Sequence, residues 1–218
     1  NGPVMRAMPQ GRAEVVAVLP FENRTGDASR DYLAAGAADQ LVTRLAALGS
    51  ITVASSPSLR EGRKLAGDVG AAARELGADL VVTGGVSVSE GRVLVDTRLT
   101  KPDGTVLWGA TRDAADGEVL GIYTQLTAGL MNALGLEPTA HAQERIARPP
   151  AASVDAYAEY LRGKEWMERQ EVTGHLEQAI AAFERAVRAD ALFARAHAAL
   201  GDALWQQFTA AGDTTAKA

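Results

Sequence analysis

The hydrophobic pattern of this chain changes its period part-way along, and this change limits the possible folds more than any other feature. Up to about Leu136, apolar runs with the two-residue period of a β-strand alternate with amphipathic runs. Beyond Ser153, only helical periodicity remains. Side chains on one face recur every second residue in a strand and about every 3.6 residues in a helix. The change of period therefore predicts an α/β part followed by an all-α part.

The first part predicts the element order β-α-β-α-β-β-β-α. Strands are expected over about residues 14–20, 51–54, 79–88, 93–99 and 105–112, and helices over about residues 30–48, 68–76 and 117–134. The two early strand–helix–strand units favour parallel pairing, whereas turns at 89–91 and 101–104 favour antiparallel hairpins. We therefore expect a mixed sheet with flanking helices.

Residues 137–152 have a different character. Pro138, Pro149 and Pro150 punctuate a polar stretch there, which predicts a linker. The expected organisation is therefore a disordered or linker lead-in over residues 1–13, an α/β domain over 14–136, the linker over 137–152, and helices over 153–218.

The helical part resembles a tetratricopeptide array. That family repeats a helix pair of ~34 residues, in which small residues let the helices approach closely. The residues that match its pattern are Gly163, Ala179, Phe183, Ala186, Leu200, Gly201 and Leu204. The match is weaker in the first helix, because about four extra residues separate Gly163 from Ala179 relative to the pattern. The resemblance implies one full repeat and the first helix of a second.

A repeat of this kind buries its apolar face on its neighbour. Trp205 and Phe208, in the last expected helix, would have little to pack on within this chain. We therefore expect the chain to be a portion of a longer protein that has more repeats.

The α/β part resembles the TolB-like (FlgO-like) amino-terminal domain family. Residues 16–27 read Val-Ala-Val-Leu-Pro-Phe-Glu-Asn-Arg-Thr-Gly-Asp, and that family opens with a strand ending in Leu-Pro-Phe and an Asn-x-[Ser/Thr]-Gly-Asp loop. Residues 73–84 are similar to its Ala-Arg-Glu-Leu-Gly anchor, and residues 93–108 to its hairpin. The resemblance covers roughly residues 14–136 and continues across the proline-containing junction.

In proteins similar to this one, the TolB-like and tetratricopeptide pair is a carboxy-terminal accessory region. It follows a bacterial Ser/Thr kinase, an adenylate or guanylate cyclase, or a winged-helix regulator. The resemblance implies sensing, scaffolding or oligomerisation, with no chemistry of its own.

Composition excludes several function classes. The formal net charge is −5 and aromatic residues make up 5%, which argues against a nucleic-acid partner. The chain has no cysteine, so disulfides, thiolate metal sites and cysteine nucleophiles are excluded. No apolar run approaches the ~18–20 residues of a membrane span.

The sequence contains no recognisable catalytic or metal-binding constellation. His141, His175 and His197 are isolated from one another, and Asp68 stands where a phosphate loop beginning at Gly62 would need lysine. The G-x-S-x-G and protein-kinase motifs are missing. We therefore expect no catalytic residue, no metal and no cofactor in this segment.

Two surfaces are candidate binding sites. The first is the rim at the carboxyl ends of the first two strands, where ligands bind in open α/β sheets. Its candidate residues are Asn23, Arg24, Thr25, Asp27, Ser55 and Ser56. The alternative is that Gly26 and Asp27 only build the turn.

The second candidate is the concave groove of the helical part. By repeat position its lining residues are Tyr157, Tyr160, Lys164, Met167, Arg195, Asp202 and Gln206. Tyrosine, methionine and arginine suit peptide recognition. The alternative is that these side chains pack on the α/β domain or on a further repeat.

The expected function is a non-enzymatic interaction or sensor module of a bacterial signalling protein, such as the regulatory region of a Ser/Thr kinase. The alternatives are a small-molecule receptor with its site at the strand rim, and the accessory region of a cyclase or a transcriptional regulator. The expected partners are a protein, a peptide or a second copy of the chain, and not nucleic acid. The sequence is compatible with either side of a bacterial membrane.

Overall fold

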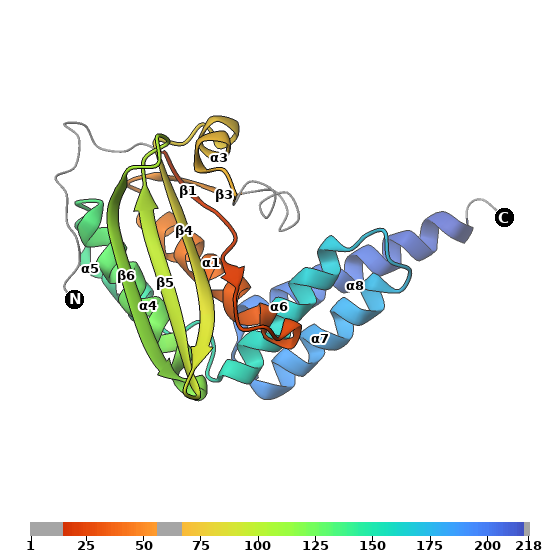
Figure 1. Cartoon of the computed structure of the whole chain (residues 1–218). Helices are drawn as coiled ribbons and strands as arrows, with labels where there is room; N and C mark the ends of the chain where they lie inside the picture. Colours follow the sequence, from red (N-terminus) through yellow and green to blue (C-terminus); the bar gives the residue numbers. More distant parts are fainter. Residues whose placement is uncertain (1–14, 56–66, 216–218) are drawn as a thin grey trace. The chain divides into compact units, whose positions relative to one another are not determined.

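The computed structural model describes residues 15–55 and 67–215 (Figure 1). The predicted lead-in over residues 1–13 and most of the loop that contains Ser56 therefore lie outside the described residues. The chain divides into two compact units, Asn1–Pro149 and Pro150–Ala218. Each unit is described by itself.

The first unit is built on a mixed sheet, as predicted. Its strands are β1 (Val15–Val18), β2 (Glu22–Asn23), β3 (Thr52–Ser55), β4 (Leu80–Ser89), β5 (Arg92–Thr100) and β6 (Val106–Ala115). They are ordered β3-β1-β4-β5-β6, and β2 pairs with β4 beyond the end of β1. Pairing is parallel among β3, β1 and β4 and antiparallel among β4, β5 and β6, which confirms the expectation from the two connection types.

The turn residues explain the antiparallel hairpins. Glu90 and Gly91 both have positive φ, 52° and 75°, which is the backbone of the tight turn whose twist matches the flanking strands. At the other hairpin, the Gly104 amide donates to the carbonyl of Lys101 at 2.9 Å, and the Asp103 carboxylate accepts from the Thr105 amide at 2.8 Å. Local turn chemistry therefore sets the register of β4, β5 and β6.

Helices cover both faces of the sheet. They are α1 (Asp31–Ala46), α3 (Val69–Leu76) and α4 (Val119–Ala133), with short 3-10 turns η1 (Ala28–Arg30) and η2 (Asp116–Glu118) before α1 and α4. Ala17 and Val81 form a buried cluster with Ala72 and Ala73 of α3. Val82, next in β4, points to the opposite face, which α1 and α4 cover (Figure 1).

The ends of α3 were predicted from sequence and are confirmed. The Asp68 side chain accepts a hydrogen bond from the Ala71 amide, and Gly77 ends the helix in the left-handed conformation at φ 59°. A carboxylate cap at the N-terminus is a start signal for a helix, and a glycine after the C-terminus is a stop signal.

Buried polar side chains connect α1 to α4, and Tyr123 and Arg44 are examples. The hydroxyl of Tyr123 donates to the carbonyl of Leu33 at 3.0 Å, and burial raises the pKa of this tyrosine. Arg44, on α1, donates to Thr124 Oγ1 at 2.6 Å and to the carbonyl of Arg148 at 3.3 Å. These bonds tie α1 to α4 and to the end of the first unit.

One further helix lies within the stretch that its prolines predicted to be a linker. Helix α5 (Ala140–Ala147) begins where Thr139 Oγ1 accepts from the Ala142 amide. Ala142 and Ile146, one helical turn apart, are both buried. A short amphipathic pattern between prolines was therefore enough for a helix, and it belongs to the first unit.

The second unit consists of α6 (Val154–Glu168), α7 (His175–Ala189) and α8 (Ala194–Thr215). This helical part confirms the predicted second architecture. Helix α6 packs against α7, and α7 against α8. Because the connections between them are short, neighbouring helices of this unit are antiparallel.

Glycine allows α6 and α7 to approach. A Cβ atom at Gly163 would lie 2.5 Å from Cδ1 of Phe183, so the ring of α7 occupies the space of the missing side chain. Phe183 is 1% exposed, and its ring centroid lies 6.0 Å from that of Tyr160. The close-packing role predicted for Gly163, Ala179, Phe183 and Ala186 is seen in this contact and in the burial of both alanines.

Replacing Thr97 by valine is expected to stabilise the first unit. Thr97 is fully buried in β5, and its Oγ1 has no hydrogen-bond partner among the described residues. Valine keeps the shape and removes the unsatisfied hydroxyl, so the free energy of unfolding should rise by about 1 kcal/mol. Urea denaturation would measure the change; a fall in stability would contradict the structure by showing that the hydroxyl is bonded in solution.

Candidate functional site

The segment after β1 runs on along β4 with one extra residue. Val18 of β1 pairs with Val82, and Glu22 of β2 pairs with Gly85. Glu22 is thus four residues after Val18, whereas Gly85 is only three residues after Val82. This extra residue is a bulge at Leu19–Phe21, beside Pro20, whose backbone cannot donate to the ladder. The bulge places β2 at the carboxyl end of β1 as a short separate strand, which the sequence analysis did not predict.

Side chains of this segment pack over two consecutive glycines of β4, one on each face of the sheet. A Cβ atom at Gly84 would overlap the backbone oxygen of Asp96 and lie 2.6 Å from Cζ of Phe21. A Cβ atom at Gly85 would lie 2.5 Å from the guanidinium carbon of Arg24. Close packing therefore explains the Gly84–Gly85 pair.

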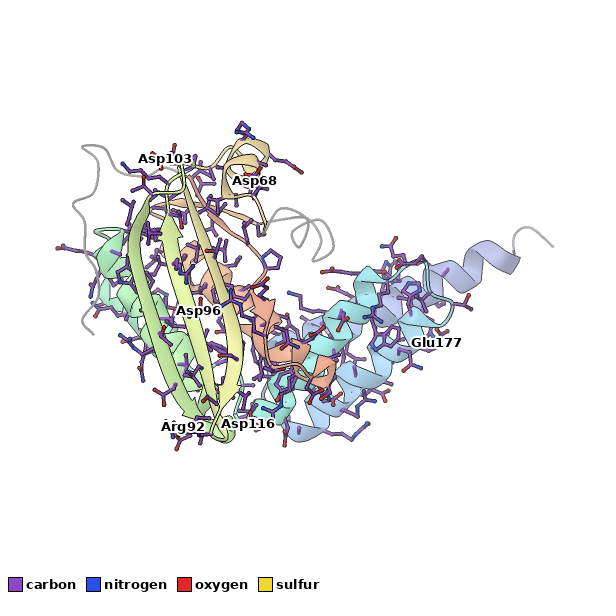
Figure 2. The ribbon with its side chains drawn as sticks, in the orientation of Figure 1. Asp68, Arg92, Asp96, Asp103, Asp116 and Glu177 are labelled. Atoms are coloured by element: carbon purple, nitrogen blue, oxygen red, sulfur yellow. The ribbon has the colours of Figure 1, made fainter. Side chains whose placement is uncertain are left out.

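Arg24 is held by two carboxylates. Its Nε lies 2.6 Å from Oε2 of Glu22, and its Nη1 lies 2.7 Å from Oδ1 of Asp96 on β5. The hydrogen bond to Glu22, together with the charges of both acids, raises the pKa of Arg24. The Asp96 bond connects positions far apart in sequence, and Figure 2 labels Asp96 midway along the sheet.

The Asn23–Asp27 loop satisfies its own polar groups. Asn23 Oδ1 accepts from the amide and hydroxyl of Thr25 at 2.9 and 2.7 Å, and Asn23 Nδ2 donates to Asp31 Oδ1 at 2.6 Å. Hydrogen bonds from Ser29 lower the pKa of Asp27, whose carboxylate caps η1. Thr25 and Asp27 thus form contacts within the turn. This agrees with the alternative interpretation, in which Gly26 and Asp27 only build the turn.

A cavity of about 670 Å³ opens beside this loop. It lies at the carboxyl end of β1 and the start of α1, where an open α/β sheet binds ligands. Its polar lining residues are Glu22, Asn23, Arg24, Asp31, Thr83, Asp96 and Arg98, and its apolar ones include Pro20, Phe21, Ala34 and Val69.

The structure brings together only some of the predicted rim residues. Asn23 and Arg24 line the cavity, whereas Thr25 and Asp27 do not, and Ser55 is exposed at the end of β3. Ser56 lies outside the described residues.

Asp96 and Arg98 were missed by the sequence analysis. They alternate with the buried Val95, Thr97 and Leu99 along β5. This alternation could have identified them, because it places two opposite charges on the same face of a predicted strand. Pairing of the hairpin then brings that face beside the carboxyl end of β1.

The cavity combines both signs of charge. Arg98 has no ion pair with another described residue, whereas Arg24 is already paired with two acids. Arg98 can therefore receive an anionic group without breaking an existing pair. Across residues 15–55 and 67–215, no group of three His, Asp or Glu side chains is placed to hold a metal ion.

The Arg24–Asp96 pair is expected to contribute modestly to stability. Both side chains are partly exposed, so the coupling free energy should be about 0.5–1 kcal/mol. A double-mutant cycle with Arg24→Gln and Asp96→Asn, read by urea denaturation, measures it. The Arg92–Asp113 pair is the control, because both of its side chains are about half exposed; a larger coupling for the control would contradict the assigned role of Asp96.

The predicted groove residues of the second unit are distributed between core and surface. Tyr157 and Tyr160 are 2% and 6% exposed. Their rings are stacked on each other, and both are tilted against the ring of Phe193. Arg195 and Lys164 lie over the Tyr160 ring, with their charged groups 4.9 and 5.9 Å from its centroid.

Met167 is half-buried, and Asp202 and Gln206 are exposed on α8. Because the two tyrosines are buried, the accessible polar part of the predicted groove consists mainly of the charged and amide side chains.

Helix α8 exposes large apolar side chains. The exposed fractions are 47% for Leu204, 65% for Trp205 and 70% for Phe208, and the two rings lie 6.0 Å apart. The sequence analysis expected this for Trp205 and Phe208. Adjacent exposed aromatic groups on a folded surface are typical of interaction sites.

Comparisons with known proteins give one curated relative. No family model matches the chain. The chain is 27% identical over 188 residues to a Rhizobium meliloti (strain 1021) protein named "Putative adenylate cyclase 3". The match covers 85% of this chain and 32% of the relative, so the chain spans about a third of that protein's length.

Solved structures with a similar arrangement include TolB, LpoB and PelC. TolB from Acinetobacter baumannii is 20% identical with a TM-score of 0.42, over 61% of this chain and 31% of that one. LpoB from E. coli is 21% identical with a TM-score of 0.38, over 46% and 56%. The PelC dodecamer from Paraburkholderia phytofirmans is 22% identical with a TM-score of 0.42, over 62% and 98%. Because all three scores lie below 0.5, the fold assignment rests on this chain's own strand order and packing.

None of the helices within the described ranges is both long and apolar enough to cross a membrane.

Proposed function

We propose that this chain is a non-enzymatic interaction and sensing region of a bacterial signalling protein. In this proposal a TolB-like α/β domain is joined to tetratricopeptide-like helices, and the surfaces of both units recognise other molecules. The motifs at residues 16–27 and 73–84 support the first assignment. The contact between Gly163 and Phe183 supports the second.

The observation that carries the proposal is the aromatic surface of α8. Trp205 and Phe208 are mostly exposed although both are large and apolar. Leaving two such rings in water is unfavourable by roughly 1.5–3 kcal/mol for each side chain that burial would otherwise stabilise. Packing of these rings on a further repeat helix or on a partner protein recovers this free energy, and either contact fits an interaction role for the second unit.

The attached effector is proposed to be a nucleotide cyclase. Among the upstream domains that the TolB-like resemblance implies, the cyclase is the one whose name the curated relative carries. The chain aligns with about a third of that relative, which leaves length for a separate catalytic domain. A Ser/Thr kinase and a winged-helix regulator are the other effectors considered.

The experiment is to obtain the complete gene that contains this sequence and assay its product. The expected product has a catalytic domain outside residues 1–218 and converts ATP or GTP to the cyclic nucleotide, whereas the 218-residue chain alone does not. A product with no effector domain, or turnover by the 218-residue chain itself, would contradict the proposal.

The cavity beside β2 favours a second candidate function, a small-molecule receptor. Its position at the carboxyl ends of the strands suits a small molecule that bears a carboxylate or phosphate, as does Arg98, which has no ion pair within residues 15–55 and 67–215. A thermal shift screen of such metabolites tests this, because a ligand at 100 times its Kd adds about 2.7 kcal/mol of stability. The shift should disappear in Arg98→Gln and persist in Arg92→Gln; a shift equal in both variants would exclude the cavity.

A further inference from the structure

The cavity beside β2 is lined by charges of both signs that alternate across one face of the sheet. Gly85 of β4 pairs with Asp96 of β5, and Arg98 is two residues further along β5, so the three positions share one face. Arg24 covers Gly85 and forms ion pairs with Glu22 and Asp96. From Glu22 to Arg98 the charges therefore run negative, positive, negative and positive.

Arg24 occupies only one oxygen of each of its two carboxylate partners. Its Nε donates to Oε2 of Glu22, and its Nη1 donates to Oδ1 of Asp96. No described residue donates to the other oxygen of either acid. The side chain of Asp96 is 25% exposed, so a donor that reaches its second oxygen is partly shielded from water, which strengthens the contact. The cavity thus offers an acceptor for a cationic group close to the guanidinium of Arg98.

A ligand with a negative charge alone does not satisfy this cavity. The lining contains the carboxylates of Glu22, Asp31 and Asp96 but only two guanidinium groups. An anion bound to Arg98 would lie beside the carboxylate of Asp96, whose charge repels it. An ammonium group on the same molecule would pair with Asp96 and offset this repulsion. The Cα atoms of Asp96 and Arg98 are about 7 Å apart along the strand, so one small molecule can reach both side chains.

The cavity also has an apolar wall, which consists of Pro20, Phe21, Ala34, Ala35 and Val69. Phe21 is 5% exposed and its ring packs over Gly84, so this wall is held firmly in place. A small number of charged groups beside an apolar wall is typical of a ligand site, and the volume of about 670 Å³ is within the range of such sites. We propose that the cavity binds a free α-amino acid with an apolar side chain, whose carboxylate pairs with Arg98 and whose ammonium group pairs with Asp96.

This inference rests on the second candidate function, the small-molecule receptor, and names its class of ligand. The two can fail separately. A carboxylate or phosphate metabolite without an amine that binds at Arg98 would support the receptor and contradict the amino acid.

The test is isothermal titration calorimetry of the 218-residue chain with L-leucine and with L-phenylalanine. Each amino acid is compared with its 2-oxo acid, which lacks the ammonium group, and with the corresponding amine, which lacks the carboxylate. At least one of the two amino acids should bind. Its oxo acid and its amine should each bind at least about tenfold more weakly, because each loses one charged contact.

Two substitutions assign the charges to their residues. Arg98→Gln should weaken binding of the amino acid at least about tenfold. Asp96→Asn should weaken the amino acid by a similar factor without weakening the oxo acid, since the oxo acid has no ammonium group to lose its partner. Arg92→Gln is the matched control, because Arg92 lies on the same strand but does not line the cavity. Circular dichroism verifies that each variant keeps its fold.

Four results would overturn the inference. The first is that neither amino acid binds, and the second is that an oxo acid binds as tightly as its amino acid. The third is equal weakening of the amino acid and the oxo acid by Asp96→Asn, which would show that Asp96 supports the shape of the cavity and does not pair with the ammonium group. The fourth is binding of the amino acid that Arg98→Gln leaves unchanged, which would place the ligand elsewhere.

Discussion

Replacing Gly84 by alanine is expected to produce the largest loss of stability in the first unit. A Cβ atom there would overlap the backbone oxygen of Asp96 and press on the Phe21 ring. Neither neighbour can move easily, because Asp96 is fixed in the β4–β5–β6 ladder and Phe21 is 5% exposed. The expected loss is about 3 kcal/mol, at the upper end for overpacking.

Hydrogen exchange of backbone amides measures this loss within one unit. The amides of β4 and β5 should exchange roughly 100-fold faster, whereas those of α6 and α7 should not change. Gly109→Ala is the matched control in the same sheet, because its nearest neighbour atom would be 3.7 Å from the new Cβ. Equal losses for the two substitutions would contradict the close contact assigned to Gly84.

Replacing Gly163 by alanine is expected to have a comparable effect on the second unit. The new Cβ would lie 2.5 Å from Cδ1 and 2.8 Å from Cζ of Phe183. The ring is 1% exposed and contacts Tyr160, so relief requires α6 and α7 to separate. We expect a loss of about 3 kcal/mol, because so small a unit has few other contacts to offset it.

Gly201→Ala supplies the control for Gly163→Ala. Both glycines lie inside helices, but nothing lies within 4 Å of a Cβ at Gly201. Gly201→Ala should raise stability by about 0.5–1 kcal/mol through helix propensity. Thermal unfolding followed by circular dichroism separates the two results, and a stabilising Gly163→Ala would contradict the observed helix packing.

A partner substitution tests the cause. If the Phe183 ring is the obstacle, Phe183→Leu should restore part of the stability lost in Gly163→Ala, so that the two substitutions are not additive. Additive losses would show that the alanine is unfavourable for a different reason.

Much of the first unit could be predicted because its signals are local. Asp68 and Gly77 bracket α3, and the turns at Glu90–Gly91 and Lys101–Gly104 fix two hairpins. Each signal acts within a few residues, so a single sequence reveals it.

The missed features of the first unit depend on distant residues. Strand β2 exists because Glu22 and Asn23 find partners on β4, far along the chain. The cavity needs Asp96 and Arg98 of β5 beside the loop after β1. No local pattern encodes such proximity, which arises only when β4 and β5 pair.

The second unit shows the same division. Gly163 and Phe183 were predicted to pack because small and large residues follow a repeat spacing, and they do. Tyr157 and Tyr160 were assigned to a groove by repeat position, yet their rings are buried with Phe193. The position in a repeat predicts on which face of a helix a side chain lies. It does not predict which other residues pack over that side chain.

The most direct test of the proposed function measures the activity of the complete protein after the exposed aromatic side chains of α8 are replaced. Cyclic-nucleotide formation should be compared for the original protein, for Trp205→Ser with Phe208→Ser, and for Leu192→Ser. The last variant is the control, because Leu192 is a 92% exposed leucine that lies before α8. We expect the double variant to change the activity by at least about fivefold, the lower range of coupling between sites, and the control to match the original protein. Equal activity in all three proteins, with the helices intact, would contradict it.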